Sequence, residues 1–305
     1  MKNFFILLIC FGSFSVSNAQ DDLMGMLEEE SAAEAKPEKI LATFKGTSVI
    51  NAQTIQTAKK KTLEFNIAHR FGDMDISNKQ GSNLGGHTLY GLENASNIRF
   101  SFTYGITDKL SVGIGRSKMN EHVDGNLKFR FLEQKANGMP ISAAYYGSAA
   151  ASFVAIVADD KFENRMSYAH QIIIASKITR GISLEVLPTY VHRNYVDQTV
   201  LHPTNGSVDE NDIFAIGVAG RFKFTKRMAF VFDYFHAFSE FRNADNNFYD
   251  AIGAGIEIET GGHVFHINVT NSKGLIANDI IPSTTSDWGN GAYKLGFNIS
   301  RSFSF

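Results

Sequence analysis

Apolar and polar residues alternate along most of this chain with a period of two. In the C-terminal segment 293–305, YKLGFNISRSFSF, the aromatic and aliphatic residues take the odd positions, and only Arg301 departs from this order. Segments 63–68, 98–104 and 252–259 repeat the pattern. A period of two places the two sets on opposite faces of a β-strand. From residue 61 to residue 305 the alternation predicts about twelve strands.

The connections between the predicted strands alternate in length. The short ones are 105–109, 179–181, 225–227 and 260–262, with a somewhat longer one at 134–139, and the long ones are 71–97, 117–124, 153–164, 196–211, 240–247 and 272–290. Gly, Asn and Asp in the short set suit tight hairpin turns. Short turns at one end, long loops at the other and an even strand count are typical of outer-membrane barrels.

Whether the apolar face of the sheet contacts lipid or a protein core distinguishes a membrane barrel from a soluble β-protein. A soluble sandwich or lipocalin-like barrel also alternates, but it buries its apolar face. Here the chain ends on an aromatic residue, Phe305, and tyrosines fall towards strand ends, as in aromatic girdles. In hydrocarbon a sheet must close on itself, because every backbone polar group needs a partner. The pattern therefore predicts an all-β, antiparallel transmembrane barrel in the outer membrane of a Gram-negative bacterium.

Composition narrows the function. The chain has 305 residues, of which 44% are hydrophobic, a formal net charge of -2, 26 Phe and only 5 Pro. A nucleic-acid partner would require a basic stripe, which this charge balance does not supply. No stretch after the N-terminus reaches the length of a transmembrane helix.

The first residues have the form of a secretory signal peptide, 1–19. Lys2 precedes the apolar run 4–11, and Ser17-Asn18-Ala19 predicts cleavage before Gln20. A lipoprotein signal ending at Cys10 is the alternative, although the residue before Cys10 is not small. Cys10 is the only cysteine, so the mature chain has no thiol chemistry.

Residues 20–60 differ from the predicted barrel domain, 61–305. Residues 21–30 are acidic, with Leu23, Met26 and Leu27 at helical spacing, and 31–39 form a polar linker. We expect an acidic periplasmic leader here, either without fixed structure or as a short helix that binds a partner or the barrel. Residues 40–60 have a mixed pattern, which fits an extra strand or a plug inside the barrel.

The polar residues at alternate positions of the predicted strands are candidates for the lumen wall. These are Glu64, Arg99, Lys128, Arg130, Glu185, Arg193, Arg221, Lys223, Asp233, Glu257, Glu259 and Lys294. A barrel of about twelve strands has a narrow lumen. The charges either pair across strands, because an isolated buried charge is costly, or form a selectivity lining for a small solute. Seven basic against five acidic residues predict at most a slight anion preference.

Other motifs give little support to metal, cofactor or catalytic sites. His263 and His266 are three apart, which puts them on opposite faces of a strand and makes a poor metal site. Gly85-Gly86-His87 and the loop histidines are expected to be solvated. Ser167 and His170 also fall on opposite faces, and no Gly-x-Ser-x-Gly elbow occurs. We therefore expect no cofactor, no metal and no enzyme activity. Trp288 is expected to pack its loop or to lie at the interface.

Several short motifs together resemble a known family. They are His69–Gly72, Tyr104–Asp108, Leu110–Arg116, Glu259–Phe265, Thr270–Ser272, Asp287–Gly289 and Gly296–Arg301. The set, from about residue 40 to the end, resembles an uncharacterised outer-membrane β-barrel family of Bacteroidetes-type bacteria, a domain of unknown function. The resemblance implies a fold and a location and brings no site residues.

Two functions of different classes fit these features. The leading one is passage or binding of a small solute through a narrow polar lumen. The alternative is a closed barrel that anchors or scaffolds partner proteins, and a lipid hydrolase of the outer membrane is a distant third. Expected partners are outer-membrane lipid, the barrel-assembly machinery through the strand ending at Phe305, and a periplasmic partner of the acidic leader. The position of residues 40–60 separates the first two functions.

Overall fold

The computed structural model describes residues 42–74, 89–136, 138–155 and 161–305. The predicted signal peptide, most of the leader and Gly85-Gly86-His87 lie outside these residues. No helix in the described part of the chain is long and apolar enough to cross a membrane.

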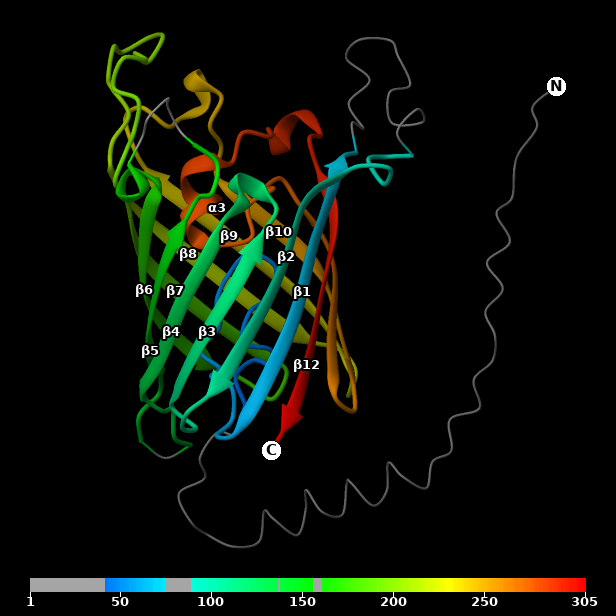
Figure 1. The fold of residues 1–305 in the computed structure, drawn as a ribbon. Coiled ribbons are helices and arrows are strands. Elements are labelled where there is room, and N and C mark those ends of the chain that lie inside the picture. Colours follow the sequence, from blue (N-terminus) through cyan, green and yellow to red (C-terminus); the bar gives the residue numbers. More distant parts are fainter. Residues whose placement is uncertain (1–41, 75–88, 137, 156–160) are drawn as a thin grey trace, which may run out of the picture. The chain divides into compact units, whose positions relative to one another are not determined.

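Residues 62–304 form a closed antiparallel barrel of twelve strands, which confirms the predicted fold class (Figure 1). The strands are β1 Thr62–Asp73, β2 Ala95–Gly105, β3 Leu110–Ser117, β4 Val123–Leu132, β5 Ser142–Ala151, β6 Met166–Lys177, β7 Ile182–Arg193, β8 Asp212–Lys223, β9 Met228–Phe238, β10 Ala251–Thr260, β11 His263–Thr270 and β12 Lys294–Ser304. In the described part of the connections lie one α-helix, α3 Ala277–Ser283, and four short 3₁₀ turns, η1 Met119–Glu121, η2 Phe162–Arg165, η3 Ala244–Asn246 and η4 Trp288–Asn290. Each strand pairs with its sequence neighbours, and β1 pairs with β12, so the sheet has no free edge.

The outer face of the barrel is apolar over most of its height. Phe100, Ile114 and Phe214 have exposed fractions of 48%, 65% and 61%, and they alternate with buried polar or small residues on the same strands. A sheet that exposes its apolar parity in this way is stable only in hydrocarbon. The alternation in the sequence therefore gives the correct outward face for β1–β4 and for β6–β12.

The inner face divides into two parts. On β5–β9 the inward residues are mostly small or aliphatic, and Ile173, Leu187, Val191 and Val231 are all 0% exposed. On β1–β4 and β10–β12 the inward residues are mostly polar or charged, such as Glu64, Lys128 and Asn298. The sequence pattern did not indicate this division, because the inward aliphatic residues of β5–β9 interrupt a strict alternation.

The described parts of the long connections lie at one end of the barrel, and the described parts of the short turns lie at the other (Figure 1). The short-turn end also holds Phe305 and the start of β1. Residues 42–60 precede β1 and lie inside the barrel, and α3 lies at the long-loop end, where it contacts β6–β9. These two segments occupy the lumen from opposite ends.

Candidate functional site in the barrel lumen

Residues 42–60 form a hairpin that enters and leaves the lumen at the short-turn end. Ser48 and Gln53 form a β-bridge, the Val49 amide donates to the Ala52 carbonyl at 2.9 Å, and the Thr54 amide donates to the Thr47 carbonyl at 3.0 Å. At the short-turn end the Lys60 amide donates to Asp108 at 3.0 Å. The tip of the hairpin, Ile50–Asn51, therefore lies deepest in the barrel.

One peptide group at the tip is held on both sides by charged side chains of the wall. Arg70 Nη2 donates to the Ile50 carbonyl at 2.7 Å, and the Asn51 amide of the same peptide group donates to Asp233 Oδ2 at 2.6 Å. The Asn51 side chain and the Ala52 amide also donate to Asp233, at 2.9 and 3.1 Å. Arg70 and Asp233 are both 0% exposed. These bonds satisfy the backbone polar groups of a turn that is buried in the lumen.

Further wall side chains hold both arms of the hairpin. Lys128 Nζ donates to the carbonyls of Thr47, Thr54 and Gln56 at 2.7, 2.9 and 3.1 Å. The Ile55 amide donates to Glu185 at 3.2 Å. Charge-assisted bonds of this kind are stronger than bonds between neutral groups. The wall charges thus bind the backbone of a segment of the same chain.

Apolar contacts add to this binding. Phe44, Val49, Ile50 and Ile55 of the hairpin are 1–4% exposed, and they belong to one buried cluster with the aliphatic side chains of β5–β9. Burial of one such side chain is worth about 1.5–3 kcal/mol, so the four together contribute roughly 6–12 kcal/mol. The polar bonds fix the position of the hairpin, and the apolar contacts make its withdrawal costly.

The α3 segment occupies the lumen at the long-loop end. Ile280 and Ile281 are 1% and 6% exposed and join the same apolar cluster. Asn278 bonds Ser148 and Ser167 at 3.0 Å each, and His122 Nδ1 lies 3.2 Å from the Asp279 carboxylate. Neutral side chains and one histidine–carboxylate contact therefore hold the first part of this segment against the wall.

A carboxylate clasped by two arginines joins the outer loops to α3. Asp209 accepts bonds from Arg193 at 2.8 Å and from Arg242 at 2.5 Å, and Arg242 also donates to the Pro282 carbonyl. Burial acts to raise the pKa of Asp209, but the hydrogen bonds and charges of both arginines outweigh it and hold that pKa below its usual value. Burial and the neighbouring Arg193 lower the pKa of Arg242. The clasp is thus charged at neutral pH.

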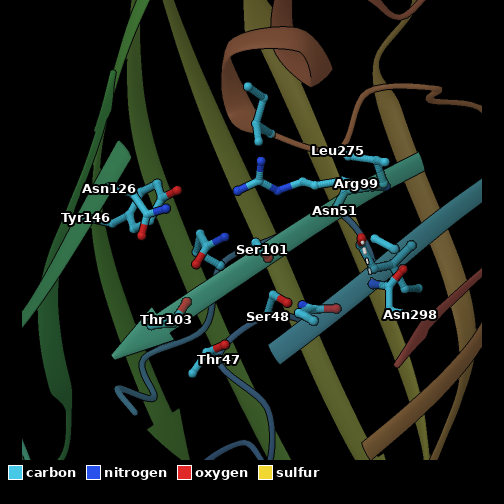
Figure 2. A pocket seen from close by; sticks show the side chains of 15 residues that line it. Thr47, Ser48, Asn51, Arg99, Ser101, Thr103, Asn126, Tyr146, Leu275 and Asn298 are labelled. Carbon is cyan, nitrogen blue, oxygen red and sulfur yellow. Dashed lines mark hydrogen bonds between the residues drawn. The ribbon is translucent and has the colours of Figure 1, made fainter. Parts of the chain in front are cut away.

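A small cavity of about 50 Å³ remains between the hairpin and the polar wall (Figure 2). Its polar lining includes Ser48, Asn51, Arg99, Ser101 and Asn126. Leu275 and Ile276, from the loop before α3, line the same cavity. This volume suits a few water molecules, since one water needs about 10–15 Å³ on this measure.

The predicted lumen residues lie in four settings. Glu64, Lys128, Arg130, Glu185, Asp233 and Glu259 contact the hairpin. Arg99 pairs with Asp124, and Arg221 pairs with Glu257 at 2.7 Å. Arg193 and Lys294 bind Asp209 and Asp73 at the long-loop end. Lys223 is exposed at the short-turn end of β8. The set combines ion pairs with contacts to the hairpin, and the slight anion preference stays a prediction.

Sequence reasoning missed three contributors to the wall. Arg70 lies six residues after Glu64 and therefore on the same, inward face of the strand, but it falls next to the predicted loop 71–97. Asp124, the partner of Arg99, falls in the predicted loop 117–124. The side chain of Arg99 reaches Asp124 across Gly115, where any Cβ would collide with the guanidinium. Asn298 has the polar parity but no charge, and it donates to the Val49 carbonyl at 2.9 Å.

The residues considered for catalysis and metal binding are separated from one another. Ser167 faces the lumen and bonds Asn278, whereas His170 is exposed on the outer face and lies 2.6 Å from the Tyr145 hydroxyl. His266 is buried beside Glu257, whereas His263 stacks on Phe265. Within the described ranges, no three His, Cys, Asp or Glu side chains form a metal-binding group. Trp288 packs on Tyr293, with ring centroids 4.6 Å apart.

Several solved structures align with most of this chain. The NanC porin aligns with a TM-score of 0.46 and 9% identity over 80% of this chain and 100% of its own. The KdgM porin aligns with a TM-score of 0.45 and 6% identity over 80% of this chain and 99% of its own. Outer membrane phospholipase A from Escherichia coli aligns with a TM-score of 0.42 and 9% identity over 83% of this chain and 96% of its own. No curated protein sequence matches the chain. A family model described as "Membrane bound beta barrel domain (DUF5777)" matches residues 44–303.

Proposed function

The chain belongs to this family of membrane-bound β-barrel domains, and from that premise we propose that it is a closed outer-membrane anchor for partner proteins. The barrel holds the chain in the membrane, the hairpin 42–60 keeps the lumen shut, and partners bind to the segment before residue 42 and to the long loops. The single observation that carries the proposal is the occupied lumen, in which the hairpin backbone is bonded to buried charges of the wall.

The energetics favour a barrel that stays closed. Withdrawal of the hairpin would expose four apolar side chains, at about 6–12 kcal/mol. It would also leave Asp233, Arg70 and Lys128 without their present bonds to the backbone of the hairpin. Such a cost exceeds thermal fluctuation by an order of magnitude. Opening would therefore require a ligand or partner that binds the open state much more tightly.

The position of residue 42 indicates which end of the barrel faces the periplasm. Residue 42 lies at the short-turn end, which is the periplasmic end in outer-membrane barrels. The acidic residues 21–30 precede this point in the chain, and a basic surface of a partner suits their charge. The long loops would face outward.

Passage of a small solute is the second candidate. It is favoured by the polar wall of β1–β4 and by buried polar atoms without a bonded partner, such as Asn66 Oδ1 beside the small cavity. Water entering beside the hairpin could satisfy these atoms. Passage of anything larger than water requires that the hairpin move.

Single-channel recording separates the two candidates. The mature chain from Gln20 is reconstituted in a planar bilayer beside a variant that lacks both residues 42–59 and the α3 residues 277–283, because both segments occupy the lumen. The anchor proposal predicts silence from the complete chain and unitary current steps from the variant, which also proves that the barrel has inserted. Stable steps from the complete chain would contradict a closed anchor and support solute passage.

A further inference from the structure

Three of the short turns have the same backbone arrangement. In each, one threonine hydroxyl accepts hydrogen bonds from the amides two and three residues later, at 2.9–3.2 Å; these threonines are Thr107, Thr179 and Thr225. The residue before each threonine is apolar and exposed: Ile106, Ile178 and Phe224 are 44%, 58% and 56% exposed. Because the geometry is shared, the charged residues around the threonine are the main difference between the three turns.

Two of these turns carry only positive charge. Residues 166–184, which include the turn between β6 and β7, contain no Asp or Glu, and neither do residues 213–232, which include the turn between β8 and β9. The basic residues at the two turns are Lys177, Arg180, Lys223, Lys226 and Arg227. Lys226 already has an interaction partner. The other four form no salt bridge within the described part of the chain, so their charges are available to a ligand.

The two turns form one continuous surface, because β7 and β8 are neighbours in the sheet. Ile182 at the start of β7 pairs with Phe222 on β8, and the Lys223 amide donates to the Gly181 carbonyl at 2.7 Å. We call residues 177–182 and 223–228 the basic patch. The two turns are two strand spacings apart, about 10 Å, a gap that two arginine side chains can bridge. Positive charges gathered without an acid create a local potential that attracts an anion.

Apolar side chains connect the basic patch to the lipid-facing surface of the barrel. Ile174 on β6 and Phe222 on β8 are 37% and 36% exposed. Ile178 and Phe224 continue these two outward rows beyond the ends of the strands. The basic patch therefore begins where the lipid-facing surface ends, at the level of lipid headgroups. This arrangement suits a ligand that is anionic at one end and apolar at the other.

We propose that the basic patch binds the headgroup of an anionic phospholipid in the periplasmic leaflet. The phosphate accepts hydrogen bonds from Arg180 and Arg227, because a guanidinium presents paired donors that match phosphate oxygens. Lys177 and Lys223 add positive potential, and the acyl chains pack on the exposed apolar residues of the patch. A zwitterionic headgroup fits less well, since the same cations repel its ammonium. The short-turn end faces the periplasm, where phospholipid can reach this site (Figure 1).

The third turn, between β2 and β3, serves as the matched control. It has the same threonine bonds and an exposed isoleucine, but it carries Asp108 beside Lys109. Lys109 also lies 3.9 Å from Glu133, so the positive charge of this turn is balanced. Lys109→Gln therefore removes one positive charge from the same end of the barrel, and from the same kind of turn, without changing the basic patch.

Native mass spectrometry of the full mature protein in detergent tests the proposal. Dioleoyl phosphatidylglycerol and dioleoyl phosphatidylethanolamine are titrated separately into the wild type, Arg180→Gln, Arg227→Gln, the double variant and Lys109→Gln. The wild type should retain phosphatidylglycerol in preference to phosphatidylethanolamine. The apparent affinity for phosphatidylglycerol should fall about 5-fold in each single arginine variant and about 25-fold in the double variant, and it should stay unchanged in K109Q. Heat-modifiable migration on gels verifies that each variant is folded.

Four results would overturn the site. Equal retention of the two lipids by the wild type would mean unselective annular lipid. Undiminished binding of phosphatidylglycerol by the double variant would place the lipid elsewhere on the barrel. A loss in K109Q as large as that in R180Q would mean that overall charge, and not the basic patch, attracts the lipid. Retention of neither lipid would exclude a lipid ligand in favour of an acidic protein partner.

Discussion

The hairpin and the α3 segment close the same lumen by different means. The hairpin 42–60 has few hydrogen bonds within itself, and Asp233, Arg70 and Lys128 satisfy its backbone from the wall. The helix α3 satisfies part of its own backbone, and it is held by aliphatic burial and by side-chain contacts such as that of Asn278. Both segments reach the same apolar cluster on β5–β9.

This difference between the hairpin and α3 shows that wall charges are needed where the backbone of an inserted segment has no hydrogen-bond partners of its own. An extended turn inside a barrel leaves N–H and C=O groups that the barrel must satisfy, and charged side chains do so most strongly. A helical turn needs fewer such partners. Loss of a wall charge should therefore release the hairpin and leave α3 in place, whereas a cavity under α3 should have the reverse effect.

The largest effect is expected from Asp233→Ala. Three donors of the hairpin tip lose their acceptor in a buried site, and the free energy of unfolding should fall by about 3–5 kcal/mol. Hydrogen–deuterium exchange should accelerate in residues 47–54 and stay slow in α3. Glu257→Gln is the matched control, because Glu257 is buried in the wall and pairs with Arg221 and His266. Protection of the hairpin in D233A would refute its role as the tip anchor.

A smaller effect confined to the other end is expected from Ile280→Ala. Ile280 is 1% exposed, and its truncation leaves a cavity worth about 2–4 kcal/mol. Exchange should accelerate in residues 277–284 and remain slow in the hairpin. Faster exchange in both segments would show that the two closures are coupled through the shared apolar cluster.

Acid should loosen the long-loop end through the Asp209 clasp. The pKa of Asp209 is lower in the folded protein than in the unfolded chain, where it is about 3.9, so its stabilisation is fully present above that value. This stabilisation is lost as the pH falls through the pKa that Asp209 has in the folded protein, and the long-loop end then loses about 1–3 kcal/mol of local stability. A spin label at Ser283 should be immobile at pH 7 and gain mobility only as the pH falls below about 3.9. Asp209→Asn should be mobile at pH 7 and at low pH; a pH response as large as that of the wild type would exclude the clasp.

The smallest effect is expected at the mouth of the lumen. Lys45 and Glu259 pair at 2.9 Å, with side chains 36% and 31% exposed. Exposed pairs contribute about 0–1 kcal/mol, so Glu259→Gln should leave thermal stability and hairpin exchange almost unchanged. A loss as large as that of D233A would mean that the hairpin depends on its entrance more than on its tip.

The alternation of the strands was predictable from the sequence because lipid and lumen impose opposite polarities on successive residues. On β12, Leu295 and Phe297 point outward, and Lys294 and Asn298 point inward. On β5 the pattern is weaker, since Ala143, Ala144 and Tyr146 are all buried. Strand ends were less predictable: Asp124 and Arg70 belong to strands and fell in or beside predicted loops.

The contacts within the lumen were not predictable in the same way. Asn51 bonds Asp233 across 182 positions of the chain, and nothing in the local pattern of residues 42–60 specifies that partner. The α3 helix is only seven residues long and contains Pro282, so its apolar spacing is too short to be recognised. The sequence indicated that charges line the lumen, but which group each one binds depends on the closed barrel.

The hairpin passes through only one opening of the barrel, because residues 42 and 60 both lie at the short-turn end. A loop that enters and leaves a ring by the same opening is not threaded through it. The seam between β1 and β12 can therefore close before or after the hairpin goes in, and no knot forms in either order. Assembly of the wall and filling of the lumen are therefore topologically independent steps. The chain passes from the hairpin into β1 at Lys61, whose amide donates to the Gly105 carbonyl at 2.8 Å.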